Sequence, residues 1–406
     1  MSDLFYSPFD QEVIGLDKIL VCSADHTTPG RYCELLGLFE QQDLKEGMDF
    51  RKPEFRREVF LRFYEFCLKY RLHAGASLPY MTFPFLSKEI GWGREELLWF
   101  VFINGNTQHP LTSWVIFNQF PDFANLDIPA LDAWYNKEWP RLEFDTDRRH
   151  QKRDFIKSVT RYKELCGCRD QAWLFHNQIV SDDPLENFQV VWDMVRKDFY
   201  SFGRMSTFSY LEYLRIARLN IEPNSLFLED ISGSKSLRNG LAKVLGRDDL
   251  DWGGPDNPTG FEGKYTPQMM DWLKKEGAIL LEEAKKRFKG RDFAQDVTYF
   301  TLESEFCTYK GWHRLNRRYP GVYADIFHGR IKKAEARWPE EDFSVFWKMR
   351  QQMLPQYLRL EDSPGDPGLK PEKQNHYRET GQVIMMLDWS CFKNDFNDRI
   401  LSIEAT

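Results

Sequence analysis

The stretch L-E-D-I-S-G-S-K-S-L-R-N-G-L, residues 228–241, lies between two segments with helical apolar periodicity, Phe208–Leu219 and Leu237–Leu245. A polar turn leading into a helix N-terminus presents free backbone N–H groups, and the helix dipole favours negative charge there. The stretch therefore predicts either an ordinary helix cap or, as the favoured interpretation, a phosphate-contacting turn. Hydroxyl and cationic side chains add hydrogen-bond donors to it: Ser232, Ser234, Ser236, Lys235 and Arg238.

The composition is that of a globular protein that can bind nucleic acid locally. The chain has 406 residues, of which 42% are hydrophobic and 29% charged, enough for a sizeable core. Aromatic residues reach 16%, which suits both an aromatic core and surfaces on which bases stack. The net charge of −7 argues against a protein covered in basic charge but leaves room for a local basic groove.

Cysteine spacing and hydropathy predict a cytoplasmic protein with no membrane partner. The seven cysteines show no zinc-site spacing and no disulfide framework, so a reducing compartment is expected. The N-terminal residues M-S-D-L-F-Y-S-P do not resemble a signal peptide. No apolar run approaches the roughly 20 residues that cross a bilayer.

Periodicity predicts an all-α fold. A period of 3.6 residues recurs along the chain, and the alternation typical of strands never holds over a useful length. Helices are expected from residue 53 to about 73, on both sides of the polar joint 104–110, and in most segments from 126 to 354. We predict three parts: an N-terminal helical extension (1–90), a helical core with a hairpin at 228–241 (91–260), and a C-terminal helical region (261–406).

Two polar segments are candidates for contact with DNA. Amide side chains gather at 104–110, where Asn104, Asn106 and Gln108 are either turn-forming caps or readers of a nucleobase. Basic and aromatic residues interleave at 310–323, either as an exposed loop or as a surface for a flipped base. The cationic residues of the second segment are Lys310, His313, Arg314, Arg317 and Arg318.

A third charged run, residues 148–153, is typical of a solvated helix face and could also contact DNA phosphates. Nucleotide-binding loops of the GxxxxGK[ST] or strand-linked GxGxxG type are absent from the sequence. The zinc motifs of zincins and of nucleobase deaminases are absent too, so no metal ligands are predicted.

Two stretches in this order resemble helix-hairpin-helix DNA glycosylases. Residues 102–126 resemble the early segment of mismatch glycosylases, and residues 231–241 lie where that superfamily has its glycine-rich hairpin. This resemblance implies a two-lobed helical fold, with Lys235 at the lyase lysine and Asp251 at the catalytic aspartate. The family hairpin reads G-x-G, whereas Ser234 replaces its second glycine here.

A closer resemblance covers most of the chain. W-F-V-F-I-N-G-N-T-Q-H-P-L-T-S-W (99–114), the hairpin stretch, C-T-Y-K-G-W-H-R-L-N-R-R-Y-P (307–320) and D-P-G-L-K-P-E-K-Q-N-H-Y (366–377) are similar to phage amino acid:DNA transferases of the alpha-glutamyl/putrescinyl thymine pyrophosphorylase group. The resemblance implies thymidine hypermodification. A kinase phosphorylates 5-hydroxymethyluracil in DNA, and the transferase replaces the phosphate with an amine, glycine being favoured.

This chemistry suggests roles for the candidate residues. The amine must lose a proton, for which Glu303, Asp251 and His313 are the candidate bases. The leaving phosphate needs cations, which Lys235, Arg238, Arg204 and the cluster at 314–318 can supply. We expect no redox cofactor, although Mg²⁺ could assist. The alternatives are a DNA glycosylase and a non-catalytic binder of modified DNA. Which amine reacts and whether phosphate or pyrophosphate leaves stay open.

Overall fold

The described part of the protein is helical throughout. The computed structural model describes residues 53–73, 79–179, 181–226, 235–251, 265–310 and 322–354, and these contain no strand. This confirms the predicted all-α class; the helix-hairpin-helix motif at 228–234 lies outside the described residues. The α-helices are α5 (Arg56–Tyr70), α6 (Pro79–Ile90), α7 (Arg94–Thr107), α8 (Pro110–Gln119), α9 (Ile128–Glu138), α10 (Phe155–Cys166), α11 (Gln171–His176), α12 (Pro184–Asp198), α13 (Arg204–Ile216), α14 (Lys235–Val244), α15 (Pro267–Arg287), α16 (Tyr299–Tyr309), α17 (Val322–Arg337) and α18 (Ser344–Met353). Short 3-10 helices are η1 (Pro53–Phe55), η2 (Thr146–Asp154), η3 (Asp248–Leu250) and η4 (Ala294–Asp296).

Several helices begin where a capping side chain precedes a proline. Asp127 accepts a hydrogen bond from the backbone N–H of Ala130, and Asp183 accepts one from Leu185. Thr266 does the same for Met269 at the start of α15. Proline follows each cap within the first turn, where its missing N–H costs nothing. These local signals fix where the three helices begin.

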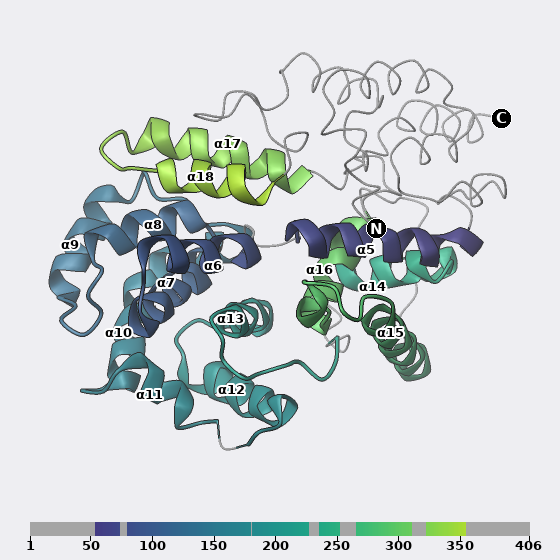
Figure 1. The fold of residues 1–406 in the computed structure, drawn as a ribbon. Helices are drawn as coiled ribbons and strands as arrows, with labels where there is room; N and C mark the ends of the chain where they lie inside the picture. Colours follow the sequence, from purple (N-terminus) through teal and green to yellow (C-terminus); the bar gives the residue numbers. More distant parts are fainter. Residues whose placement is uncertain are drawn as a thin grey trace, which may run out of the picture.

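Figure 1 shows two groups of helices. The large lobe contains α6 to α13, with α17 and α18 packed over α8 and α6. The small lobe contains α5, α14, α15 and α16. Residues 56–70 therefore pack with helices from beyond residue 234, and the division at 90 and 260 stays a prediction.

Aromatic rings form much of the core in both lobes. Phe102 of α7 stacks on Tyr162 of α10, with 3.8 Å between ring centroids. In the small lobe Phe60 of α5 stacks on Phe306 of α16 at 5.0 Å. Between the lobes, Phe300 of α16 meets Phe208 of α13 at 4.8 Å. Such pairs stabilise by about 1 kcal/mol each beyond the area they bury.

Arg149, His150 and Arg153 of the charged run at 148–153 are exposed as predicted, but Arg148 and the joint at 104–110 differ from the sequence prediction. Arg148 is only 2% exposed instead of solvated, and its guanidinium donates to the backbone carbonyls of Asn106 and Ser201. Residues 104–107 continue α7 rather than forming a loop, so the joint is two residues long. Helix α6 was not predicted as a separate helix within the N-terminal helical extension, because Pro79 and Pro84 interrupt its apolar pattern.

Helices α14 and α16 approach very closely at Gly240. A Cβ atom built on Gly240 would lie 2.0 Å from the backbone oxygen of Phe306. By contrast, a Cβ on Gly277 of α15 would meet side chains alone, with the end of Leu226 nearest at 2.6 Å and Leu241 at 3.7 Å. Backbone cannot move aside as a flexible side chain can, so the α14–α16 crossing requires glycine.

We expect Gly240→Ala to lower the free energy of unfolding by about 3 kcal/mol, and Gly277→Ala by about 1 kcal/mol, through overpacking. Gly329→Ala is the matched control, because a Cβ there meets nothing within 4 Å. Its higher helix propensity should stabilise α17 by about 0.5–1 kcal/mol. Urea denaturation measures all three. Equal losses for Gly240→Ala and Gly277→Ala would contradict the tight crossing.

Candidate active site

One face of α16 carries a partly exposed stripe of reactive side chains. Glu303, Cys307 and Lys310 follow at intervals of four and three residues, so they share this face. The thiol of Cys307 donates to Glu303 Oε1 at 3.7 Å. Lys310 Nζ donates to the hydroxyl of Ser236, on the first turn of α14, at 2.7 Å. Carboxylate, thiol, hydroxyl and ammonium groups thus form one polar strip in the small lobe.

Glu303 has the electrostatics of a group that exchanges protons near neutral pH. Burial raises the pKa of Glu303 to about 7. The positive charge of Arg204, at the start of α13, and the hydrogen bond from Cys307 oppose the rise, while Glu305 adds to it. A carboxyl with such a pKa is partly ionised at neutral pH, as a general base needs.

Two further carboxylates lie behind Glu303. Burial raises the pKa of Glu212, on α13, to about 8, and the negative charge of Glu303 contributes to this rise. Glu305 is fully buried and its Oε1 lies 2.8 Å from Nδ1 of His73. Tyr80 of α6 lies close enough to Glu212 for the carboxylate to raise the pKa of the phenol. Glu212 and Tyr80 of the large lobe and Glu303 and Glu305 of the small lobe therefore form one carboxylate cluster, which connects the two lobes.

The structure brings four of the predicted site residues together. Glu303, Lys310 and Ser236 share the strip described above, and Arg204 acts on Glu303 through its charge. Lys235 is the first residue of α14. The remaining candidates of the two loop segments lie outside the described residues, and their roles stay predictions: Ser232, Ser234, His313, Arg314, Arg317 and Arg318.

Asp251 and Arg238 lie away from the stripe, inside the small lobe. Asp251 is 1% exposed, and its Oδ2 is 3.1 Å from Nζ of Lys243. Arg238 is fully buried, with its guanidinium carbon 4.6 Å from the centre of the Tyr265 ring. In this arrangement neither side chain reaches solvent.

The amides at the α7–α8 joint are buried too. Asn106 donates to the backbone of Phe102 and accepts from Arg148 at 2.8 Å, so it holds that arginine in place. Asn104 accepts from the hydroxyl of Ser113 at 3.2 Å. Gln108 caps α7 in the left-handed conformation, with φ of 49°. These contacts stabilise the large lobe, and reading of a base by the amides stays a prediction.

A basic cavity of about 580 Å³ lies between α17 and the segment 140–152. Its lining holds five cationic side chains and two carboxylates: Arg149, Lys152, Arg330, Lys333, Arg337, Glu143 and Asp145. Arg330 pairs with Asp145 at 2.6 Å, and Arg337 and Lys333 share Glu143. The cavity lining carries more positive than negative side chains, and this charge affects the pKa of the buried His109. Burial and then the charges of Arg330 and Lys333 lower the pKa of this histidine to about 3.

Sequence reasoning did not identify Glu212, His73 or the basic cavity. The sequence signal for Glu212 was its place as the one acid in the apolar run F-S-Y-L-E-Y-L (208–214). Acidic side chains are rarely buried unless they are paired, so an acid on a buried helix face indicates a structural or functional role. The cavity is lined by residues about 180 positions apart in the sequence, so no local sequence pattern predicts it.

The described ranges contain no group of three acidic, cysteine or histidine side chains placed to hold a metal ion. Within the same ranges, every helix is too short or too polar to cross a membrane.

Two comparisons with known proteins found matches. The sequence model of the amino acid:DNA transferases matches residues 78–310, more than half of the chain and a range that includes Arg204, Ser236, Glu303 and Lys310. A protein of Salmonella phage ViI named serinyltransferase is 28% identical over 350 residues, covering 82% of this chain and 83% of that protein. No solved structure matches the chain.

The raised pKa of Glu212 predicts that stability falls as pH rises. Above the unfolded-state pKa of about 4.5 the unfolded chain releases the Glu212 proton, whereas the folded chain keeps it up to about pH 8. The free energy of unfolding should therefore decline by up to ~1.4 kcal/mol per pH unit in this window from this group.

Glu212→Gln removes the titrating group and keeps the shape, so its unfolding free energy should depend less steeply on pH between 5 and 8. Urea denaturation across that range tests this, with Glu282→Gln on the exposed face of α15 as the control. Parallel curves for the wild type and Glu212→Gln would show that Glu212 does not keep its proton.

Proposed function

This chain belongs to the amino acid:DNA transferases, and from that premise we propose that it joins a small amino acid to phosphorylated 5-hydroxymethyluracil in phage DNA. The enzyme transfers an amino acid in the modification of DNA, as its family does. The sequence resemblance favours glycine, and the relative named serinyltransferase supports serine. The acceptor base follows from the kinase step that the resemblance implies. We further propose that the enzyme acts in the cytoplasm of an infected bacterium.

The proposed reaction is a substitution at the methylene carbon on C5 of the base. The amine lone pair forms the C–N bond, and the C–O bond breaks. Phosphate or pyrophosphate leaves with the electron pair, and the new ammonium gives one proton to a base. No atom changes its oxidation state overall, so the reaction balances without a redox cofactor. Mg²⁺ could lower the negative charge on the departing phosphate.

Glu303 is the residue best suited to take the proton. It is partly exposed on the same face of α16 as Cys307 and Lys310, and burial raises its pKa to about 7. An amine must be neutral to attack, and a base with a pKa near the working pH is the most efficient acceptor. The contact of Glu303 with Cys307, on the helix face that also carries Lys310, supports this assignment together with the raised pKa.

Cations along the same face suit the leaving phosphate. Lys310 and Arg204 are partly exposed, and the hydroxyl of Ser236 accepts from Lys310. Preorganised positive charge stabilises the charge that develops on a leaving group. The modified base must leave the helix stack to reach these groups, at a cost of a few kcal/mol.

The proposal is tested with DNA containing 5-hydroxymethyluracil that a hydroxymethyluracil DNA kinase has phosphorylated. After incubation with the protein and a mixture of amino acids, mass spectrometry of the nucleosides should show a new nucleoside that carries glycine or serine. Glu303→Gln should lower kcat by about 10²- to 10⁴-fold. The wild-type rate should rise with pH through an apparent pKa near 7, and the variant should lack this rise.

Glu282→Gln, a partner of Lys285 on α15, is the matched control and should keep full activity. Abasic sites in place of a new nucleoside would support a glycosylase, and unchanged nucleosides would support a non-catalytic binder. A Glu303→Gln variant with unaltered kcat would assign the base elsewhere.

The basic cavity is suited to the DNA backbone. Its cations outnumber its carboxylates on a chain whose net charge is −7, so it concentrates positive charge where the rest of the protein would repel DNA. Lysine and arginine side chains bind phosphates without reading sequence. We therefore assign the cavity to the phosphodiester backbone beside the modified base.

Salt dependence of DNA affinity tests this assignment. Arg149→Gln combined with Lys333→Gln should weaken binding several-fold and reduce the slope of log affinity against log salt by about 1 per residue. Fluorescence anisotropy of a labelled duplex measures both. Lys285→Gln on the small lobe is the control, and a double variant with the same slope as Lys285→Gln would remove the cavity from the interface.

A further inference from the structure

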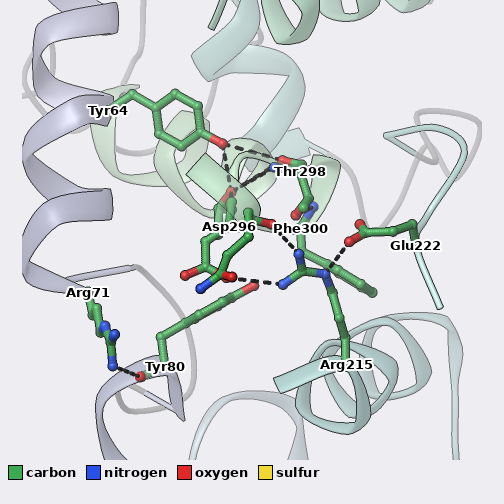
Figure 2. Close-up of polar contacts among 10 residues, drawn as sticks. Tyr64, Arg71, Tyr80, Arg215, Glu222, Asp296, Thr298 and Phe300 are labelled. Atoms are coloured by element: carbon green, nitrogen blue, oxygen red, sulfur yellow. Dashed lines mark hydrogen bonds and ion pairs between the residues drawn. The ribbon is translucent and has the colours of Figure 1, made fainter. Parts of the chain in front are cut away.

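A second cavity, of about 380 Å³, lies where the C-terminal ends of α5 and α13 meet the start of α6. A volume of this size suits a small molecule. Figure 2 shows much of its polar wall, with Arg215 between two carboxylates and Arg71 reaching the backbone of Tyr80. The charged and phenolic side chains that line it are Arg71, Tyr80, Arg215, Arg218, Glu222 and Asp296.

Arg215 holds the two carboxylates in place. Its Nε donates to Glu222 Oε1 at 2.5 Å, and its Nη1 donates to Asp296 Oδ1 at 3.2 Å. Its Nη2 donates to the backbone carbonyl of Gln295. Burial of the guanidinium works against its charge, but the acids around it raise the pKa of Arg215. Each carboxylate uses one oxygen for Arg215, so the second oxygen can accept a hydrogen bond from an ammonium group.

Arg71 and Arg218 line the same cavity from strained backbone positions. Their φ angles are 55° and 74°, in the left-handed region that favours glycine. Within the described part of the chain, Arg71 donates to the carbonyl of Tyr80 at 3.4 Å, and neither arginine has a carboxylate within 4 Å. Positive charge near a helix C-terminus stabilises the helix dipole, and Lys69 and Arg215 already supply it in the last turns of α5 and α13. The helix dipoles therefore do not account for the positions of Arg71 and Arg218.

We propose that this cavity binds the amino acid co-substrate, with Arg71 and Arg218 on its carboxylate and Glu222 and Asp296 on its ammonium group. A guanidinium matches a carboxylate with two parallel hydrogen bonds, which selects for an amine that also carries an acid. The inference rests on the proposed function, since it names the site of that reaction's second substrate.

The cavity adjoins the carboxylate cluster through Tyr80. This side chain lines the cavity, and it lies beside Glu212, whose carboxyl lies in turn close to Glu303. Glu212 is also one turn before Arg215 on α13. An amino acid bound between the two arginines and the two carboxylates is therefore connected to Glu303 through Tyr80 and Glu212.

Arg71→Gly and Arg218→Gly separate ligand binding from folding, because glycine adopts positive φ without strain and the fold should be kept. With phosphorylated DNA at saturation, each variant should raise the KM for glycine or serine about tenfold or more, as expected for a lost charged hydrogen bond. DNA affinity and the melting temperature should stay close to wild type. Ser201→Gly, at φ of 65° and outside the cavity lining, is the control for the backbone change.

A second comparison isolates the carboxylate. Glycinamide keeps the amine of glycine but lacks the acid, so wild type should use it with a much higher KM than glycine, and Arg71→Gly should reduce this difference. Calorimetric titration of the full chain with glycine, serine, glycinamide and inorganic phosphate measures binding without turnover.

Unchanged KM and unchanged binding in both arginine variants would overturn the proposal while leaving the transferase function intact. Binding of inorganic phosphate that is lost in the variants, with amino acid binding unaffected, would assign the cavity to the leaving group and also overturn it. Transfer of no amino acid by the wild type would instead contradict the proposed function, and calorimetry would still decide whether the cavity binds amino acids.

Discussion

The candidate active site depends on the close crossing of α14 and α16. Gly240 lets the backbone of α14 reach Phe306, and Phe306 stacks on Phe60, so α5 is fixed by the same contact. This crossing sets the distance at which Ser236 meets Lys310. It also fixes the face of α16 that carries Glu303. A helix with a larger residue at position 240 would be pushed outward, and the polar strip would separate into two unrelated surfaces.

The carboxylates behind that strip are costly to the fold. An ionised acid loses its hydration when buried, so it either finds a cation or keeps its proton. Glu212 keeps its proton at neutral pH. Glu303 is partly ionised there, because the charge of Arg204 partly offsets the effect of burial on its pKa. Proteins accept such losses of stability where a proton must move. The same two lobes contain ample aromatic core to offset this cost, from the Phe102–Tyr162 stack to the inter-lobe pair Phe208–Phe300.

Local patterns predicted most of the helices, and they selected several side chains that the structure brings together. Helical period and Asp-Pro or Thr-Pro starts depend only on neighbours in sequence, so they could be read directly. Ser236 was a candidate because it lies in a polar turn at a helix start, Lys310 because basic and aromatic residues interleave there, and Glu303 because the reaction needs a base. Arg238 and Asn106 show the limit, because the same polar residue types also hold a core together. Glu212, Arg71 and Arg218 acquire their meaning only from tertiary contacts and from backbone angles, which no periodicity encodes.

The two cavities differ in a way that matches the two substrates. DNA is a polyanion, and a chain with a net charge of −7 repels it except where cations are concentrated within about a Debye length, roughly 10 Å in 0.1 M salt. The cavity beside α17 has five cations, of which Arg330, Lys333 and Arg337 are held in place by Asp145 and Glu143, and this concentration of charge supports the proposed contact with DNA. A free amino acid has no net charge at neutral pH, so long-range attraction cannot select it. It requires opposite charges fixed a few ångströms apart, and the cavity around Arg215 has that pattern.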